Sequence, residues 1–317
     1  MNAVVLAWLT LCMIWGSTWL FIKLGLQDLP PFTFAGIRFL LASIILSLVI
    51  YFRKTRLPQN RGDWLFIAWT GFLCVTVNFA LVFWAGQYVS SGLAALLNAT
   101  MPFFGMIIAP HYLPAERITP AKLGGVVLGM TGVGLIFSNQ LSLQGMLSLF
   151  ACIAIVVGAL VAAYANVLIK LRGRHLDPVV LSAGQMLFGF PVLLGIGVIA
   201  EGNPLHLQWT PLALASLSYL TIIGSCMAFI LYFWMLQRIT VTKALLLLLV
   251  TPLVAVTLGK LVNNEELTWR LLAGGVCIIA GVGATIFYRQ RTPASSSVNK
   301  ILTGPLQLQE ALVKHKP

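Results

Sequence analysis

Residues 83–102 read FWAGQYVSSGLAALLNATMP, and residues 233–252, which lie 150 positions later, read FWMLQRITVTKALLLLLVTP. The match continues without a gap to Phe137. Beyond the quoted stretch it pairs Glu116 with Glu266 and Gly124-Gly125 with Gly274-Gly275. An apolar composition produces chance matches between leucines, but it does not place a tryptophan, a proline, a glutamate and a glycine pair at one common separation. The chain therefore contains an internal repeat.

The composition points to a membrane. Of the 317 residues, 59% are hydrophobic and only 9% are charged, and the mean hydropathy is +0.94. A soluble protein carries about 25% charged residues, so this chain cannot cover a water-facing surface. The net charge of +12 does not indicate a nucleic-acid partner, because the basic residues form short clusters between apolar runs instead of following one face.

Apolar runs long enough to cross the bilayer occur ten times, since a spanning helix needs about 20 such residues. Prolines mark many of the breaks between the runs. The expected spans are Val4–Leu24, Thr33–Phe52, Asp63–Trp84, Ser90–Leu113, Ala121–Phe137, Gly145–Lys170, Pro178–Ala200, Leu212–Leu236, Val241–Val262 and Leu271–Tyr288. The fold class we predict is all-α integral membrane, with ten transmembrane helices.

The lysines and arginines predict the orientation of these spans. With the N-terminus inside, sixteen of the twenty lie on the inner side, three lie outside, and Arg38 falls within a span. Short cytoplasmic loops carry an excess of such residues. We therefore expect both termini in the cytoplasm and a multi-pass protein of the bacterial inner membrane.

Each copy contains five helices, which is an odd number. The chain therefore ends the first copy on the other side of the membrane, and the second copy enters from the opposite side. The sequence thus predicts two inverted five-helix repeats, residues 1–140 and 141–290, followed by a disordered cytosolic tail, residues 291–317. Inverted repeats are typical of secondary transporters that open a central site to each side in turn. A duplicated scaffold without a transported substrate is the alternative.

Several short motifs resemble those of EamA-type transporters of the drug/metabolite transporter superfamily. They are Trp15-Gly16-Ser17, the run Phe34–Phe39, Ala85–Tyr88, Ser91, Ala94-Ala95, Pro102, Glu116-Arg117 and Gly124-Gly125, with partial repetition around Pro252, Glu266 and Gly274-Gly275. The resemblance covers about residues 1–288. It implies ten helices in two inverted halves, a central cavity, and export of amino acids, related metabolites or drugs. Thr251 departs from the family pattern, which often has an acid there, so a coupling role for this position is in doubt.

Arg38 is the first candidate for substrate binding. A charged side chain within a span costs about 2.5–3.5 kcal/mol on insertion scales, so it needs a partner or a wet cavity. It could attract a substrate carboxylate. It could instead extend outward to the interface, or pair with Asp28 or with helix-end carbonyls.

Further candidates lie on the first span and in the middle of the others. Trp15 and Trp19 share one helix face and could line a cavity, although interfacial tryptophans are the usual alternative; Ser17 and Thr18 lie beside them. The polar candidates in other spans are Asn78, Asn98, Tyr164, Asn166, Gln185, Tyr232 and Thr251. Such amides and hydroxyls often bond across helices instead of touching substrate.

Pro102 and Pro252 occupy matched positions within their spans, where a proline weakens one helical turn. This suits a hinge, and a static kink is the alternative. The glycines Gly124, Gly125, Gly129, Gly274 and Gly275 are expected to let helices approach closely.

The sequence contains no catalytic constellation, no metal-binding spacing and no nucleotide-binding motif, so we expect no enzyme and no cofactor. No predicted span holds Asp or Glu near its centre, which argues against an acid-based proton antiporter. The leading hypothesis is a secondary exporter of small metabolites, with amino acids first. An integral-membrane enzyme or scaffold, a passive channel and a drug or toxic-compound exporter are alternatives. Small-molecule substrate and lipid bilayer are the expected partners, and a monomer is plausible.

Overall fold

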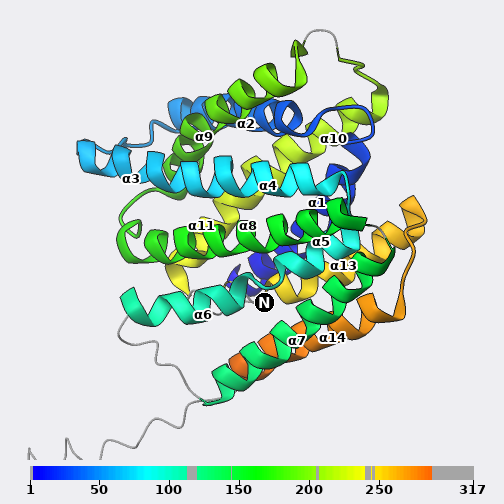
Figure 1. Ribbon diagram of the computed structural model, residues 1–317. Coiled ribbons are helices and arrows are strands. Elements are labelled where there is room, and N and C mark those ends of the chain that lie inside the picture. The colour runs from blue at the N-terminus through cyan, green and yellow to red at the C-terminus, as the bar shows by residue number, and fades with distance from the viewer. Residues whose placement is uncertain are drawn as a thin grey trace, which may run out of the picture. The chain divides into compact units, whose positions relative to one another are not determined.

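The computed structural model describes residues 3–112, 120–143, 145–204, 207–239, 244 and 247–287, and the regular structure in these ranges is helical (Figure 1). The helices are α1 (Ala3–Gly25), α2 (Pro31–Arg53), α3 (Arg61–Gly71), η1 (Phe72–Val77), α4 (Asn78–Gly86), α5 (Ser91–Asn98), α6 (Met101–Tyr112), α7 (Pro120–Leu143), α8 (Gly145–Arg172), α9 (Pro178–Glu201), α10 (Pro211–Thr221), η3 (Ile222–Met227), α11 (Ala228–Arg238), α13 (Leu247–Asn263) and α14 (Trp269–Phe287). The predicted loop with Glu116 and the predicted tail, residues 291–317, lie outside the described residues.

The helices account for the ten predicted spans. Seven described segments are long and apolar enough to cross a membrane. Three of these combine several helices: Arg61–Gly86 joins α3, η1 and α4, Ser91–Tyr112 joins α5 and α6, and Pro211–Arg238 joins α10, η3 and α11. Shorter apolar stretches in α7, α13 and α14 complete the set. The predicted fold class, with ten spans as two inverted repeats, is confirmed.

Local sequence signals explain where several helices begin. Proline occupies the first helical position of α2, α9 and α10, where its missing N–H costs no hydrogen bond. Side chains cap other N-termini: Asn60 accepts from the Gly62 N–H, Ser90 from the Leu93 N–H, and Asp177 from the Val179 and Val180 N–H groups. The proline-marked breaks in the sequence are thus the ends of real helices.

Helices of one repeat pack mainly against helices of the other. The most extensive contacts join α2 to α9, α1 to α13, α4 to α8 and α6 to α8, and each pair takes one member from residues 1–143 and one from residues 145–287. Figure 1 shows α2 and α9 side by side, and α7 beside α14. The described helices of both repeats thus form one packed unit, which ends at Ile286.

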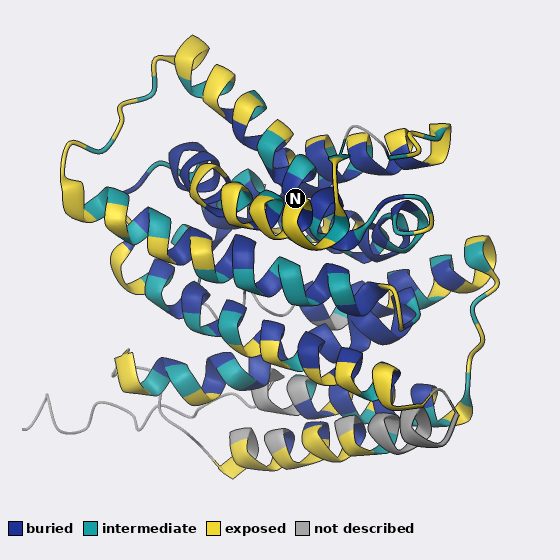
Figure 2. Ribbon diagram, turned by 45° about the horizontal axis from the view of Figure 1, so that its top comes forward, coloured by how far each residue is buried: buried dark blue, intermediate teal, exposed yellow. Residues whose placement is uncertain are grey.

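The outward faces of the helices are apolar. Leu6, Leu65 and Ile199 are 53%, 71% and 88% exposed, and Figure 2 shows exposed residues along the outer faces of helices whose inner faces are buried. A water-soluble protein does not expose so many large apolar side chains in contiguous patches. The exposed faces are therefore suited to lipid chains.

Two π-helical turns interrupt matched spans. η1 and η3 cover Phe72–Val77 and Ile222–Met227, so they lie 150 positions apart. A π-turn leaves some backbone carbonyls without their usual α-helical partner and is frequent at functional sites. The repeat therefore extends from the sequence to a backbone irregularity in the middle of each span.

The antiparallel spans define two ends of the packed unit. We name the Glu265 end after the α13–α14 connection; the α1–α2, α4–α5 and α9–α10 connections lie there too. The Asp63 end, named after the start of α3, also holds the α8–α9 connection.

Candidate functional site: a central cavity

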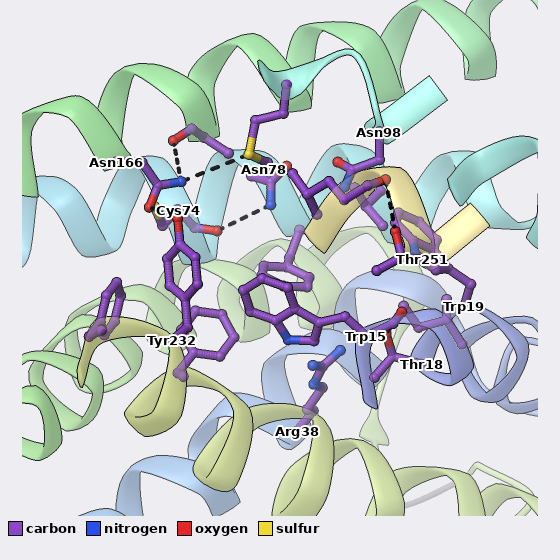
Figure 3. A pocket seen from close by; sticks show the side chains of 18 residues that line it. Trp15, Thr18, Trp19, Arg38, Cys74, Asn78, Asn98, Asn166, Tyr232 and Thr251 are labelled. Carbon is purple, nitrogen blue, oxygen red and sulfur yellow. Dashed lines mark hydrogen bonds between the residues drawn. The ribbon is translucent and has the colours of Figure 1, made fainter. Parts of the chain in front are cut away.

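A cavity of about 110 Å³ lies among helices of both repeats (Figure 3). It is bounded by parts of α1, α2, α4, α5, α6, α8, α11 and α13 and by one residue of η1. Its lining residues are Trp15, Thr18, Trp19, Ile22, Arg38, Cys74, Asn78, Phe79, Val82, Asn98, Met101, Ala162, Asn166, Phe229, Tyr232, Phe233, Leu248 and Thr251. We call this space the central cavity.

The central cavity lies where the two repeats meet. Four pairs of its lining residues are separated by the repeat offset of 150 positions: Phe79 and Phe229, Val82 and Tyr232, Asn98 and Leu248, and Met101 and Thr251. A space lined by equivalent positions of two related units lies between those units. This is the place where transporters built from inverted repeats hold their substrates.

Arg38 is the charged residue of the cavity lining. Its side chain is buried, at 2% exposure, and Figure 3 shows its guanidinium directed toward Trp15. Nε donates to Ser225 Oγ at 2.8 Å and Nη2 to the Gly224 carbonyl at 3.3 Å. Nη1 has no hydrogen-bond partner in the described part of the chain. The guanidinium is thus anchored on one side and keeps a free donor on the other.

The backbone of η3 makes this anchoring possible. Gly224 and Ser225 both belong to the π-turn, where a carbonyl is free to accept from outside the helix. A Cβ on residue 224 would lie 2.8 Å from Thr18 Cγ2 and 3.4 Å from Arg38 Nη2. Glycine at 224 therefore lets α1 and the guanidinium approach the turn closely.

Aromatic rings surround the rest of the guanidinium. Its central carbon lies 5.0 Å from the ring centroid of Phe39, 5.1 Å from that of Phe79 and 5.8 Å from that of Phe83. These distances allow cation–π attraction, which is worth about 2 kcal/mol or more when the partners are desolvated. The rings stabilise the buried charge without neutralising it.

All carboxylates in the described part of the chain lie outside the central cavity. Asp28 accepts from Thr210, Asp63 pairs with His175, Asp177 caps α9, and Glu201 and Glu265 accept from backbone N–H groups at the starts of α2 and α5. Glu266 is exposed. Arg38 therefore neither pairs with Asp28 nor extends outward, and within the described chain its charge faces the cavity without an acidic partner.

An aromatic wall lies beside Arg38. The Trp15 ring centroid is 5.0 Å from that of Tyr232 and 6.0 Å from that of Phe229, and Phe79 lies 6.3 Å from Phe229. Trp19 also lines the cavity, one turn further along α1. The two tryptophans predicted to share a cavity face do share one.

A polar wall lies away from Arg38. The Tyr232 hydroxyl donates to Asn166 Oδ1 at 3.1 Å, and Asn166 Nδ2 donates to the Ala162 carbonyl at 2.9 Å. Figure 3 shows Asn78 and Asn98 on the same side of the cavity as Asn166. Asn78 Oδ1 has no partner among the described residues, and Thr251 donates to the Leu248 carbonyl of its own helix. Amide and hydroxyl groups therefore line the side that faces the aromatic wall.

Three residues predicted to bind substrate lie outside the central cavity. Ser17 Oγ lies 2.7 Å from the Tyr219 hydroxyl, on the α10 side of α1. The Tyr164 ring lies 6.1 Å from that of Tyr112. Gln185 is buried, and its Nε2 donates to Thr70 Oγ1 at 2.9 Å. The geometry gives these three side chains interhelical contacts; their contact with substrate remains a prediction without support from the cavity.

The two predicted hinge prolines have different surroundings. The span that contains Pro102 is broken: α5 ends at Asn98, and α6 begins at Met101. A proline clashes with the carbonyl four residues earlier, which here belongs to Asn98. Pro252 lies inside the continuous helix α13. A hinge remains a prediction for both positions, and the break is present only at the first.

The predicted packing glycines lie mostly at close helix contacts. A Cβ on Gly129 would overlap the Phe103 ring, and one on Gly275 would lie 2.9 Å from Leu96 Cδ2. Gly125 and Gly274 offer their carbonyl oxygens 2.5 Å from where a Cβ on Gly281 and on Gly132, respectively, would lie. Gly124 has open space at its Cβ position. Thus α7 and α14 meet through glycines, with Gly132 and Gly281 adding to the predicted set.

Two glutamates join the two repeats at the Glu265 end. Glu265 accepts from the Ser91 and Gly92 N–H groups, and Glu201 accepts from those of Phe32 and Thr33, all at distances between 2.8 and 3.2 Å. Both glutamates belong to the second repeat, whereas the N–H groups belong to the first. Carboxylates stabilise helix N-termini, so these contacts hold the repeats together at this end.

Several contacts of the candidate site were not predicted from the sequence. Phe79, Met101, Ala162 and Phe229 line the cavity, Gly224 and Ser225 accept hydrogen bonds from Arg38, and Glu265 caps α5. The repeat offset could have pointed to Phe79 and Phe229. No metal-binding group of three or more His, Cys, Asp or Glu occurs in the described ranges.

The chain is similar to known transporters over most of its length. The model of the EamA-like transporter family matches residues 2–138 and 149–287. The uncharacterized transporter YoaV of Bacillus subtilis is 28% identical over 90% of this chain and 98% of its own. The uncharacterized inner membrane transporter YedA of Escherichia coli is 32% identical over 87% of this chain and 88% of its own.

A solved crystal structure gives the same fold, with a TM-score of 0.69 at 17% identity over 92% of this chain and 99% of the other. The family match covers both repeats, each as one copy of the model. Its members named above are transporters and not enzymes. This chain therefore belongs to the EamA-like transporter family and is a multi-pass membrane transporter.

Proposed function

We propose that this transporter is a secondary carrier that exports a small metabolite with a single carboxylate, an amino acid being the leading candidate. The central cavity binds the metabolite, and the two repeats rock to open the cavity to each side in turn.

One observation carries the proposal: Arg38 lines the central cavity, and its buried guanidinium has an Nη1 without a hydrogen-bond partner and no acidic partner in the described chain. A buried cation of this kind is costly unless a counter-ion approaches it. A substrate carboxylate fits, because it is planar and accepts from a guanidinium. One cation balances one carboxylate, so nucleotide sugars and other multiply charged substrates are disfavoured.

The ammonium group of an amino acid would also have binding partners in the cavity. An ammonium is attracted by aromatic faces, and Trp15 and Phe229 offer such faces in the cavity lining. The carbonyl oxygens of Asn78 and Asn98 can accept its hydrogen bonds. The cavity thus has a cationic side and a side rich in acceptors, which suits a zwitterion.

Contacts that join the two repeats at each end of the packed unit are compatible with alternating access. Glu201 and Glu265 hold the repeats together there, whereas at the Asp63 end the Asp63–His175 pair, at 3.1 Å, links them. The excess of lysine and arginine in the loops of the Asp63 end supports a cytoplasmic location for that end. Export would then require the glutamate contacts to open after the substrate has bound from the cytoplasm.

Coupling to protons through an embedded acid has no support, because the described carboxylates lie at helix ends. The carrier would run down the gradient of its substrate, or would respond to the membrane potential through the charge of the substrate.

Counterflow in proteoliposomes tests the proposal. The protein is reconstituted into vesicles preloaded with one unlabelled amino acid, and uptake of the same labelled amino acid is followed, over a panel of amino acids and their methyl esters. We expect saturable counterflow for at least one free amino acid and none for its ester, which lacks the carboxylate. Equal counterflow of acid and ester would contradict the role of Arg38.

A drug or toxic-compound exporter is the second candidate, because the aromatic wall of Trp15, Phe79 and Phe229 suits a flat apolar ring. Counterflow of an aromatic cation without a carboxylate, together with no signal from amino acids, would favour this candidate. Flux that does not saturate would indicate a channel, and the absence of flux for every compound would favour a scaffold.

A further inference from the structure

A second hollow, which shares no lining residue with the central cavity, lies on the outer face of α2 and α9 at the Asp63 end. Its volume is about 710 Å³, within the range of roughly 300–1,000 Å³ that is typical of small-molecule sites. Its floor and sides include Ile50, Leu57 and Leu187, and Lys54 stands at its rim. We call it the α2–α9 groove.

The groove is apolar along its length. Leu57 and Leu187 are 52% and 45% exposed, and Tyr51 and Phe52 beside them are 75% and 76% exposed. Trp64 also lines it, and its indole N–H donates to the Pro58 carbonyl at 3.0 Å. A tryptophan with an apolar ring and a satisfied N–H is typical of the membrane–water boundary. The groove therefore runs from that boundary along the lipid-facing surface of the helices.

The chain segment that runs past the groove, from the end of α2 to the start of α3, is strongly basic. Arg53, Lys54, Arg56 and Arg61 lie within nine consecutive residues, and all four are exposed. The nearby Asp63 is paired with His175, and the side chains of the four cations make no ion pair within the part of the chain that the structure describes. Lys54 thus lines the apolar groove, and the other three cations lie within seven positions of it in the same chain segment, without an ion-pair partner among the described residues.

The backbone fixes the position of this charge. α2 ends at Arg53, and Lys54 follows in the left-handed region with φ 50°, its N–H bonded to the Tyr51 carbonyl. This turn directs the chain across the rim, so that Lys54, Thr55 and Leu57 line the groove in succession. The corresponding connection of the second repeat, residues 202–210, contains no lysine or arginine. The basic rim is therefore a property of one repeat and not of the shared scaffold.

We propose that the α2–α9 groove binds an anionic phospholipid. The phosphate headgroup lies among Arg53, Lys54, Arg56 and Arg61, and one acyl chain lies in the groove along Ile50, Leu57 and Leu187. Basic pockets between transmembrane helices on the cytoplasmic side bind anionic headgroups in this manner, and the cytoplasmic leaflet is the negatively charged one. The apolar groove explains why a lipid, and not a soluble anion, is the occupant.

Lipid retention measured by native mass spectrometry tests the site. The purified full chain is mixed with phosphatidylglycerol or with phosphatidylcholine of the same acyl chains, and bound lipid and melting temperature are recorded. We expect phosphatidylglycerol to be retained preferentially and to raise the melting temperature more. Retention of both lipids to the same extent would overturn the proposal.

Two pairs of variants locate the binding. Lys54→Gln/Arg56→Gln removes two rim charges and should weaken retention of phosphatidylglycerol by roughly tenfold or more, since each interfacial cation contributes about fivefold. Arg172→Gln/Arg238→Gln removes the same charge from exposed positions outside the 53–61 segment, and should change phosphatidylglycerol retention little. Equal losses in both pairs would mean that overall charge, and not this site, selects the lipid.

Two further experiments test whether the lipid occupies the groove itself. Ser47 is exposed and lines the groove, so Ser47→Trp should fill it and displace the lipid while the protein keeps its melting temperature in detergent alone. Phosphatidylglycerol with a photoreactive acyl chain should label peptides of α2 and α9 in the unmodified protein. Labelling elsewhere, or equal stabilisation by glycerol phosphate without acyl chains, would contradict a lipid site in the groove.

Discussion

The two repeats share a scaffold and differ in chemistry. Both contain a π-turn at the same place, η1 and η3, and both contain a lysine that caps a neighbouring span: Lys23 donates to the carbonyls of Gly86 and Val89, and Lys170 to those of Leu236 and Ile239. The carbonyls lie 150 positions apart. These shared features hold helices in place, and they recur because both repeats must build the same bundle.

The positions that face the cavity recur in both repeats, but most of their side chains differ. Trp15 and Trp19 on α1 correspond to Ala162 and Asn166 on α8, 147 positions later, and Asn98 corresponds to Leu248. Ala35-Gly36 of α2 matches Ala183-Gly184 of α9 at an offset of 148 positions, and at this offset Arg38 corresponds to Met186. The first repeat thus provides the charge and the larger aromatic surfaces of the cavity. The comparison teaches that the fold is symmetric while the proposed recognition of substrate is not.

The largest effect on transport is expected at Arg38, where the two repeats differ most in charge. Arg38→Gln removes the free charged donor, and hydrogen bonds to charged groups contribute about 1.5–3 kcal/mol. We expect the apparent affinity for the transported amino acid to fall roughly ten- to a hundredfold in counterflow. Met186→Leu, at the equivalent position, conserves volume and should change transport less than twofold. Similar losses for both variants, at unchanged melting temperature, would erase the distinction between the repeats.

A smaller effect is expected at the aromatic wall. Trp15→Leu removes ring contacts with Tyr232 and Phe229, and such contacts contribute about 0.5–1.5 kcal/mol. Substrate affinity should fall roughly two- to tenfold. Trp69→Leu, at a tryptophan that is 50% exposed and outside the cavity, serves as the control. An equal fall in the control would indicate a general loss of stability.

The prolines test whether the break in the first repeat matters for movement. Pro102→Ala allows α5 and α6 to join, because the clash with the Asn98 carbonyl disappears. We expect the turnover rate to fall several-fold with little change in substrate affinity. Pro252→Ala, in the continuous α13, should leave turnover nearly unchanged. If only the second substitution slowed turnover, the hinge would belong to the other repeat.

The smallest difference is expected for the shared lysines. Lys23→Met and Lys170→Met each remove a charged donor from carbonyls at the end of a span, so each should lower the free energy of unfolding by about 1–2 kcal/mol. The two variants should agree within about 0.5 kcal/mol in thermal unfolding. A loss confined to one of them would show that the scaffold is less symmetric than the contacts indicate.

Much of the fold was predictable because hydropathy and the repeat offset report on whole spans. A run of apolar residues determines where a helix crosses, and the parity of five helices determines the inversion. The helix start at Pro178 agreed with the prediction, and α10 begins at Pro211, one residue before the predicted Leu212, because proline and the preceding cap act locally.

The site was predictable only in part, because whether a side chain faces the cavity depends on how helices that are far apart in the sequence pack together. Ser17 and Thr18 are neighbours, yet successive residues of a helix point about 100° apart, and only Thr18 lines the cavity. The partners of Arg38 come from η3, nearly 190 residues later, and depend on a π-turn that hydropathy does not reveal. The break before Pro102 likewise depends on local crowding and not on composition.

The central claim is that a cavity between inverted repeats is reached from both sides of the membrane in turn. Cys74 lines this cavity and offers a native probe once Cys12, Cys152, Cys226 and Cys277 are replaced by alanine. A small membrane-impermeant thiol reagent is added to either face of sealed vesicles, with and without the transported amino acid. We predict that Cys74 reacts from both faces and that the amino acid protects it. Reaction from one face only, unaffected by substrate, would contradict the account.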